Sequence, residues 1–146
     1  MDSIKILTIS RIGSPLGGRG FESFSEDPHL SGMLAAAIIQ GVQSEGVVAT
    51  PKHFVCNDQE EHRRGLETIV TDRALREIYL KPFQLALAQS NPHAIMTAYN
   101  KLNGKLCSQS PELLQRILRE EWGFEGATIS DWYNHASSPA IDKRAS

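Results

Sequence analysis

The chain has 146 residues, of which 40% are hydrophobic and 22% are charged, and its formal net charge at pH 7 is -2. This length and balance are typical of one globular domain and exclude a disordered chain as the default. The small negative charge, with basic residues scattered along the sequence, gives no electrostatic basis for a nucleic-acid partner.

No apolar stretch is long enough to cross a bilayer, and residues 1–5 lack the basic segment and apolar core of a secretory signal. We therefore expect a soluble chain without a membrane partner, and the sequence leaves its location open. Cys56 and Cys107 are too few for a disulfide framework and predict ordinary free thiols. His62 beside Glu60 and Glu61 has no second ligand pair at a fixed spacing, so no metal site is predicted.

The first apolar run, residues 4–9, predicts a strand that leads into a glycine- and proline-rich loop at 13–20. Arg19 lies in this loop, where an arginine is most often solvated. Its small neighbours also allow the guanidinium to reach a polar ligand in a bidentate manner. Asp27 then predicts an N-cap before Pro28, and apolar residues at helical spacing predict an amphipathic helix as far as Gly46.

The next apolar run, residues 47–55, predicts a strand covered on both faces, with Pro51 at its edge or end. Lys52 and His53 fall near the C-terminal tip of this strand, and the lysine needs partners or water once it is buried. The alternative interpretation is an exposed strand end with one satisfied histidine. The charged loop that follows at 56–65 is typical of a solvated surface unless a rigid scaffold holds it.

A second helix is predicted from Thr71 or Asp72 to about residue 87, with a kink at Pro82. Residues 94–99 predict a strand, and a turn-rich loop at 100–104 closes it. Met96 and Tyr99 lie near the C-terminal end of this strand. Taken separately, Met96 would fill the core and Tyr99 would be half-buried with its hydroxyl in water.

A third helix is predicted by Ser110 as N-cap and Pro111 at the first position, and it ends at Gly123. Residues 127–129 then predict a short strand that delivers Asp131 and Trp132 at its C-terminal tip. In parallel α/β proteins the carboxyl ends of the strands face the active site. The alternative is that Asp131 only caps a following turn or helix.

The alternation of strands and helices predicts right-handed βαβ units and a parallel sheet. Four polar or aromatic side chains then fall on the same rim of that sheet: Lys52, His53, Tyr99 and Asp131. Their convergence favours a functional interpretation over a purely structural one.

Four motifs of the chain resemble glycoside hydrolase family 3, and fungal β-glucosidases most closely. The motifs are GRGFESFSEDP at 18–28, KHFVCNDQE at 52–60, MTAYN at 96–100 followed by NG at 103–104, and EWGFEG at 121–126 leading into SDW at 130–132. The resemblance covers about residues 14 to 132. It implies a (β/α)8-type barrel, cleavage of terminal non-reducing β-D-glucose with retention, and no cofactor. The partner that it implies is a β-glucoside or a short gluco-oligosaccharide.

Asp131 is similar to the nucleophile of the family, which attacks the anomeric carbon and forms a covalent glycosyl-enzyme. Lys52 is predicted to lie near Asp131 and to keep it ionised, because a nearby cation lowers a carboxyl pKa. The positions that match the sugar-binding residues of the family are Arg19, Lys52, His53, Met96, Tyr99 and Trp132.

A complete barrel of this type has about 250 residues, whereas this chain predicts three strands and a possible fourth at 4–9. We therefore expect about half of the βα units, a partial (β/α)8 TIM-type barrel formed by residues 1–132, and a polar tail at 133–146 that does not match the family. No counterpart is expected for the second domain, which supplies the general acid/base glutamate. None of the following matches that glutamate: Glu22, Glu26, Glu60, Glu61 and Glu125.

The chain is accordingly expected to be an incomplete and catalytically impaired fragment that self-associates through exposed sheet edges. One alternative is a non-catalytic sugar-binding or interaction fragment of the same family. A second is a lyase or aldolase that uses Lys52 as a Schiff-base nucleophile. The N-acetylhexosaminidase branch of the family is a further alternative, but its catalytic histidine loop is not matched at residues 56–58.

Overall fold

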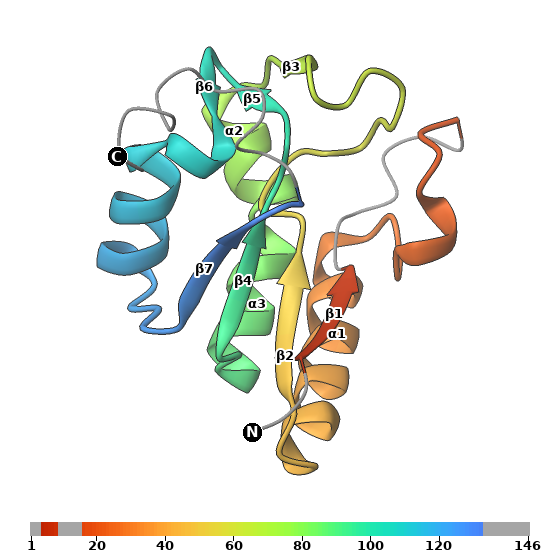
Figure 1. Cartoon of the computed structure of the whole chain (residues 1–146), viewed down its shortest axis with the longest axis vertical. Helices are drawn as coiled ribbons and strands as arrows, with labels where there is room; N and C mark the ends of the chain where they lie inside the picture. The colour runs from red at the N-terminus through yellow and green to blue at the C-terminus, as the bar shows by residue number, and fades with distance from the viewer. Residues whose placement is uncertain (1–3, 9–15, 133–146) are drawn as a thin grey trace.

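The computed structural model of the chain describes residues 4–8 and 16–132, so the tail predicted after Trp132 and most of the loop before Leu16 lie outside the described residues. Four strands, coloured red, yellow, green and blue in Figure 1, run side by side in the same direction. They are β1 (Ile4–Thr8), β2 (Val48–Lys52), β4 (Ala94–Thr97) and β7 (Ala127–Ser130). The predicted strands are confirmed, although two of them are shorter than expected.

Register along these strands is parallel throughout. Ile4 of β1 pairs with Val48 of β2, and Ala94 of β4 pairs with Ala127 of β7. Just beyond β2 the chain bridges to β4, where Phe54 N–H donates to the Met96 carbonyl at 2.8 Å and Phe54 carbonyl accepts from Ala98 N–H at 2.8 Å. The spatial order is therefore β1, β2, β4, β7, so consecutive βαβ units lie next to one another.

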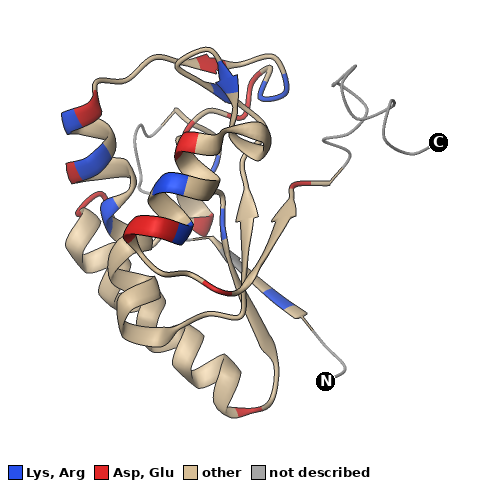
Figure 2. Ribbon diagram, turned by 90° about the vertical axis from the view of Figure 1, so that its left-hand side faces the viewer, with Lys and Arg blue, Asp and Glu red and all other residues tan. Residues whose placement is uncertain are grey.

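Two long helices, α1 (Pro28–Ser44) and α3 (Lys81–Ser90), pack against each other and lie on one side of the four strands (Figure 2). The start of α1 follows the prediction, because the Asp27 carboxylate accepts a hydrogen bond from Leu30 N–H at 2.8 Å and Pro28 occupies the first turn. The buried core between helices and strands includes Ala35, Ile39, Ala49, Phe83, Ala86 and Ile95. Apolar burial between the two layers thus fixes the strands that carry the polar rim.

The helix predicted with a kink at Pro82 is broken into three segments, which corrects that prediction. They are α2 (Asp72–Ala74), capped by the Thr71 hydroxyl, a π-helical segment η2 (Leu75–Tyr79), and α3. Leu80 N–H donates to the Leu75 carbonyl, five residues back, at 2.8 Å. Pro82 has no N–H, and it stands in the first turn of α3, where none is needed. The proline therefore begins a helix here and does not bend one from within.

The third helix forms as the π-helical segment η4 (Glu112–Glu121), which follows a short 3-10 turn, η3 (Cys107–Gln109). The Ser110 hydroxyl accepts a hydrogen bond from Leu113 N–H at 3.3 Å, as its predicted capping role requires. Trp122 N–H donates to the Ile117 carbonyl at 3.1 Å, a wider turn than that of an α-helix. Gly123 ends the helix with a φ of 65°.

A small second sheet, which the sequence did not predict, includes part of the turn-rich loop predicted at 100–104. It consists of β3 (Glu67–Thr68), β5 (Lys101–Leu102) and β6 (Lys105–Leu106), with β5 and β6 antiparallel. Asn103 and Gly104 join β5 to β6 with φ values of 48° and 88°. Positive φ at both central residues is what a tight hairpin turn requires, so this Asn-Gly pair was a usable hairpin signal.

The architecture as a whole is an α/β fold, as the alternating pattern predicted.

Cys56 and Cys107 are buried free thiols, and burial raises the pKa of both, that of Cys107 to about 11. Among residues 4–8 and 16–132, none of the helices combines the length and the apolarity needed to cross a membrane.

Candidate functional site

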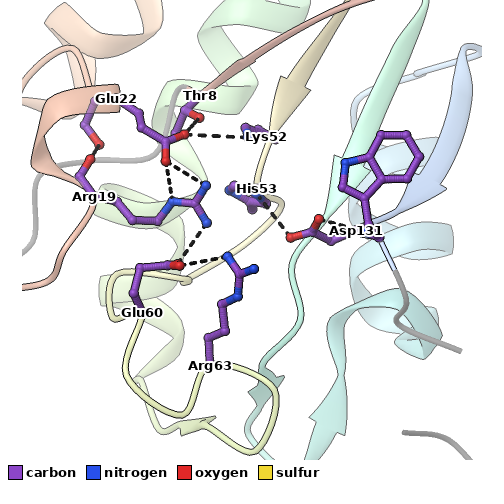
Figure 3. A network of polar contacts seen from close by, with 10 residues as sticks. Thr8, Arg19, Glu22, Lys52, His53, Glu60, Arg63 and Asp131 are labelled. Carbon is purple, nitrogen blue, oxygen red and sulfur yellow. Dashed lines mark hydrogen bonds and ion pairs between the residues drawn. The ribbon is translucent and has the colours of Figure 1, made fainter. Parts of the chain in front are cut away.

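The carboxyl ends of the parallel strands bring His53 and Asp131 into direct contact. His53 directly follows β2 and Asp131 directly follows β7, and His53 Nε2 lies 3.3 Å from Asp131 Oδ2 (Figure 3). Both side chains are buried, with 2% and 7% of their surface exposed. The strand alternation predicted that these residues share one rim, and the structure places them there.

Asp131 is held as an anion at this rim. Burial alone would raise the pKa of its carboxyl group, but the contact with His53 Nε2 acts in the opposite direction. Trp132 N–H donates to Asp131 Oδ1 at 2.8 Å, and the charge of Arg63 adds to the effect. The net result is a lowered pKa, so Asp131 is ionised at neutral pH. The structure assigns to His53 the effect that the sequence had predicted for Lys52.

His53 is neutral at pH 7 because burial lowers the pKa of its imidazole below the ordinary value of 6.5. Its contact with Asp131 raises the pKa, whereas the charges of Arg19 and Lys52 lower it further, and burial prevails. A neutral imidazole can donate to the Asp131 carboxylate only when its proton is on Nε2. That tautomer is therefore the one that fits the contact.

Next to this pair lies a cluster of five side chains whose charges alternate in sign, the charged cluster (Figure 3). In order of contact its members are Lys52, Glu22, Arg19, Glu60 and Arg63. The contacts between their nitrogen and oxygen atoms are 3.6, 2.7, 2.8 and 2.7 Å. Because each carboxylate stands between two cations, the cluster compensates its own charges while it is partly withdrawn from water.

Arg19 is the centre of the charged cluster, and its side chain is only 12% exposed. Glu22, in the 3-10 turn η1 (Gly20–Glu22), binds it on one side and Glu60 binds it on the other. Burial raises the pKa of Glu22, but the Thr8 hydroxyl, Arg19 and Lys52 outweigh that effect and lower it. The prediction that left Arg19 as a solvated loop residue is therefore wrong, because two carboxylates hold its guanidinium, whereas the alternative that it reaches a polar ligand stays a prediction.

Tyr99 is buried, with 2% of its surface exposed, and not half-buried as the strand pattern taken alone suggested. The guanidinium carbons of Arg63 and Arg64 lie 5.0 and 5.5 Å from the centre of its ring, within the range of a cation–π interaction. Burial and the negative charge of Asp131 raise the pKa of its phenol. Tyr99 is therefore a neutral phenol beside the charged loop at 56–65 and close enough to Asp131 to sense its charge.

Met96 and Trp132 are placed differently from the polar residues. Met96 is buried in β4, where it pairs with Ile129 of β7, and 1% of its surface is exposed. Trp132 follows Asp131 directly and is 62% exposed, so one large aromatic surface stands beside the buried carboxylate. Neither side chain takes part in the charged cluster.

Three members of the cluster were not predicted as site residues: Glu22, Glu60 and Arg63. Glu22 lies three positions after Arg19, the spacing at which side chains meet on one helical turn. Arg63 and Glu60 come from the charged loop at 56–65, which the sequence pattern describes equally well as solvated surface. In the part of the chain that the structure describes, no three His, Cys, Asp or Glu side chains are grouped to hold a metal ion.

Comparison with protein-family models matches residues 6–145 to the model described as the glycosyl hydrolase family 3 N terminal domain. A beta-glucosidase of Kluyveromyces marxianus is 57% identical over 129 residues, which are 88% of this chain and 15% of that protein. The probable beta-glucosidase J of Neosartorya fischeri is 62% identical over 126 residues, which are 86% of this chain and 15% of that protein. The chain thus spans 15% of the length of these curated relatives.

Comparison with solved structures also finds beta-glucosidases. The crystal structure of the Kluyveromyces marxianus beta-glucosidase in complex with glucose has a TM-score of 0.86 and 57% identity, over 87% of this chain and 15% of that one. The structure of beta-glucosidase 3B from Thermotoga neapolitana in complex with alpha-D-glucose has a TM-score of 0.86 and 54% identity, over 88% of this chain and 18% of that one.

Proposed function

The chain belongs to glycosyl hydrolase family 3, as its four motifs predicted, and on that basis we propose that it carries part of a retaining β-glucosidase site. The reaction is hydrolysis of terminal, non-reducing β-D-glucosyl residues. The observation that carries the proposal is the buried, ionised Asp131 at the carboxyl edge of the parallel strands, 3.3 Å from His53. The names of the relatives, two of which are solved with glucose bound, support a β-glucoside as the substrate.

We propose that β1, β2, β4 and β7 are consecutive strands of a (β/α)8 barrel, about half of its βα units. Their parallel order and the helices packed on one side support this arrangement, since a barrel carries its helices outside and its site at the carboxyl ends of the strands. The domain boundary after residue 132 stays a prediction, because residues 133–146 lie outside the described part of the chain.

Asp131 is proposed as the nucleophile. A carboxylate oxygen of Asp131 attacks the anomeric carbon, the bond to the leaving oxygen breaks, and a general acid protonates that oxygen. Water then hydrolyses the glycosyl ester. The lowered pKa supports this role because only the anion attacks, and His53 orients the carboxylate. Glu22 and Glu60 are engaged with arginine, so we assign the general acid to neither.

Sugar binding is proposed for the side chains that surround Asp131. Arg19 and Lys52 would donate hydrogen bonds to hydroxyl groups, since their side chains are 12% and 20% exposed and a ligand can reach them. Trp132 would line the same subsite with its exposed ring, whereas Met96 and Tyr99, which the family motif also predicts there, are 1% and 2% exposed in this structure. His53 would bind a hydroxyl group or hold Asp131, and its contact with Asp131 favours the second role.

The chain alone is expected to turn over slowly, because no described carboxylate is assigned as the proton donor. Trapping with 2-deoxy-2-fluoro-β-D-glucosyl fluoride tests the nucleophile separately, since fluoride leaves without protonation. We expect a glucosyl ester on Asp131, located by peptide mass spectrometry, and its loss in Asp131→Asn. Asp27→Asn is the matched control, because asparagine also caps the helix at that position.

Trapping that is unchanged in Asp131→Asn would contradict the proposed nucleophile. Rapid hydrolysis of an aryl β-glucoside by the purified chain would contradict the expected impairment. Glucose binding without any ester would instead identify the non-catalytic sugar-binding alternative.

The Schiff-base alternative is less well supported. Lys52 Nζ lies 3.6 Å from the Glu22 carboxylate, and an ammonium in an ion pair is not the desolvated free amine that such enzymes use.

We also propose that the open edges of β1 and β7, each paired with one strand among the described residues, promote self-association.

A further inference from the structure

We infer, on the basis of the proposed function, that Glu22 is a positioning residue that orients Arg19 and Lys52 together toward one sugar ring. It would act through these two cations and would not itself touch the reacting atoms. The role is distinct from proton donation, for which the family motif gives Glu22 no match.

The geometry around Glu22 carries the inference. Its Oε1 atom accepts from Arg19 Nε at 2.8 Å and lies 2.7 Å from Arg19 Nη2. Its Oε2 atom accepts from the Thr8 hydroxyl at 2.6 Å and lies 3.6 Å from Lys52 Nζ. One carboxylate thus ties together the tip of β1, the turn η1 and the tip of β2 (Figure 3).

The donors that remain show what this arrangement can do. A guanidinium group has five N–H donors and a lysine ammonium has three. Glu22 accepts from Arg19 Nε and contacts Nη2, and Glu60 accepts from Nη1, so two of the five donors have no partner among the described residues. A planar group held on two edges cannot turn freely, so the remaining donors keep a fixed direction. Fixed donors lower the entropy that a polyhydroxylated ring loses on binding.

An ion pair that only stabilised the fold would not need one carboxylate to contact two cations from different segments. Exposed pairs such as Arg73–Glu77 contribute little to stability, whereas Glu22 is 20% exposed and contacts two cations from different segments. Both cations are partly exposed and lie beside His53 and Asp131 (Figure 3). The placement therefore fits orientation of ligand-binding groups better than it fits support of the fold.

The test compares Glu22→Gln with Glu77→Gln, the same chemical change in an exposed ion pair on η2. Two readouts are needed. The first is the Arg19 Nε–H resonance in ¹⁵N NMR, which needs no sugar. The second is the dissociation constant for D-glucose at a temperature where the amide spectrum shows each variant to be folded. We expect Glu22→Gln to shift the Arg19 resonance and speed its exchange with water, and to weaken glucose binding by about tenfold or more. Glu77→Gln should change neither readout.

An unchanged Arg19 resonance in Glu22→Gln would overturn the inference whether or not the chain binds sugar. A changed resonance with unchanged glucose affinity would also overturn it, because Glu22 would then support only local structure. Failure of the wild-type chain both to bind glucose and to form the trapped ester would instead overturn the proposed function, while the resonance would still decide whether Glu22 orients Arg19.

Discussion

His53 links the stability of the site to pH at the level of a single side chain. Its pKa is lowered in the folded chain, chiefly by burial, from an ordinary value of 6.5. At a pH between the folded and the unfolded pKa, the unfolded chain therefore binds more protons than the folded chain. Stability then rises with pH in that window. The contribution of His53 is complete above about pH 6.5 and is lost as the pH falls through the lower, folded pKa.

We predict that the free energy of unfolding decreases as the pH falls from 7 to 5, and that His53→Gln flattens this decrease. Urea unfolding at several pH values measures it. His62→Gln is the control, since the His62 side chain is 90% exposed and should leave the pH dependence as in the wild type. An equally steep pH dependence in His53→Gln would contradict the explanation. Glu22 and Asp131, whose pKa values are also lowered, act in the same direction but only in more acidic solution.

At this scale, the sequence predicted Asp131, His53 and Lys52 as neighbours on one rim, because apolar runs show where strands end. It did not predict the ion pair between Arg19 and Glu60, which lie 41 positions apart. A long-range pair of this kind depends on how two loops meet, and neither loop has a periodicity that records it. Arg63 was missed for a different reason, because it pairs with Glu60 inside one charged loop that the sequence pattern describes equally well as solvated surface.

At the scale of elements, the contact between α1 and α3 depends on a glycine. A Cβ atom on Gly32 would lie 2.7 Å from Leu85 Cβ and 3.0 Å from the Pro82 carbonyl oxygen. Gly41, on the same helix, has no neighbour within 4 Å of that position. Alanine at Gly32 therefore tests close packing between the helices, whereas alanine at Gly41 tests intrinsic helix propensity.

Gly32→Ala is predicted to destabilise the chain by about 1–3 kcal/mol through overpacking. Gly41→Ala is predicted to stabilise it by about 0.5–1 kcal/mol, because alanine loses less backbone entropy in a helix. Denaturant unfolding of the two variants decides the matter, and effects of the same sign would contradict the packing explanation.

Helix starts were well predicted, since Asp27, Thr71 and Ser110 each accept a backbone hydrogen bond at the expected position. The π-helical turns of η2 and η4 were not predicted. Their hydrogen bonds reach back five residues, a spacing that the apolar pattern of an amphipathic helix does not distinguish from four. The strands that end at Lys52 and Thr97 were predicted too long, because the chain stays buried after the hydrogen-bonded ladder ends.

At the scale of the whole molecule, the α/β order followed from the alternation of elements, whereas the assembly state depends on surface that the chain exposes. Ile4 on β1 is 61% exposed, and β1 pairs only with β2 within the described residues. An apolar edge strand of this kind is a template for pairing with another chain.

We predict concentration-dependent self-association of the purified chain, measured by sedimentation velocity. Ile4→Lys should shift the equilibrium toward monomer, because a charged side chain blocks edge pairing. Ile69→Lys makes the same change at a 76% exposed isoleucine that lies outside the four parallel strands, and it should have no such effect. A monomer at all concentrations, or an equal effect of both variants, would contradict association through the edge.

The unequal environments of the two tryptophans give the molecule a built-in optical reporter. Trp122 packs against Phe54, with ring centres 6.0 Å apart, whereas Trp132 is 62% exposed beside Asp131. Indole emission shifts to shorter wavelength as water is removed from the ring. Light emitted by Trp132 would therefore report on a ligand at the proposed sugar site, and that of Trp122 on the integrity of the core, within one spectrum and without any attached dye.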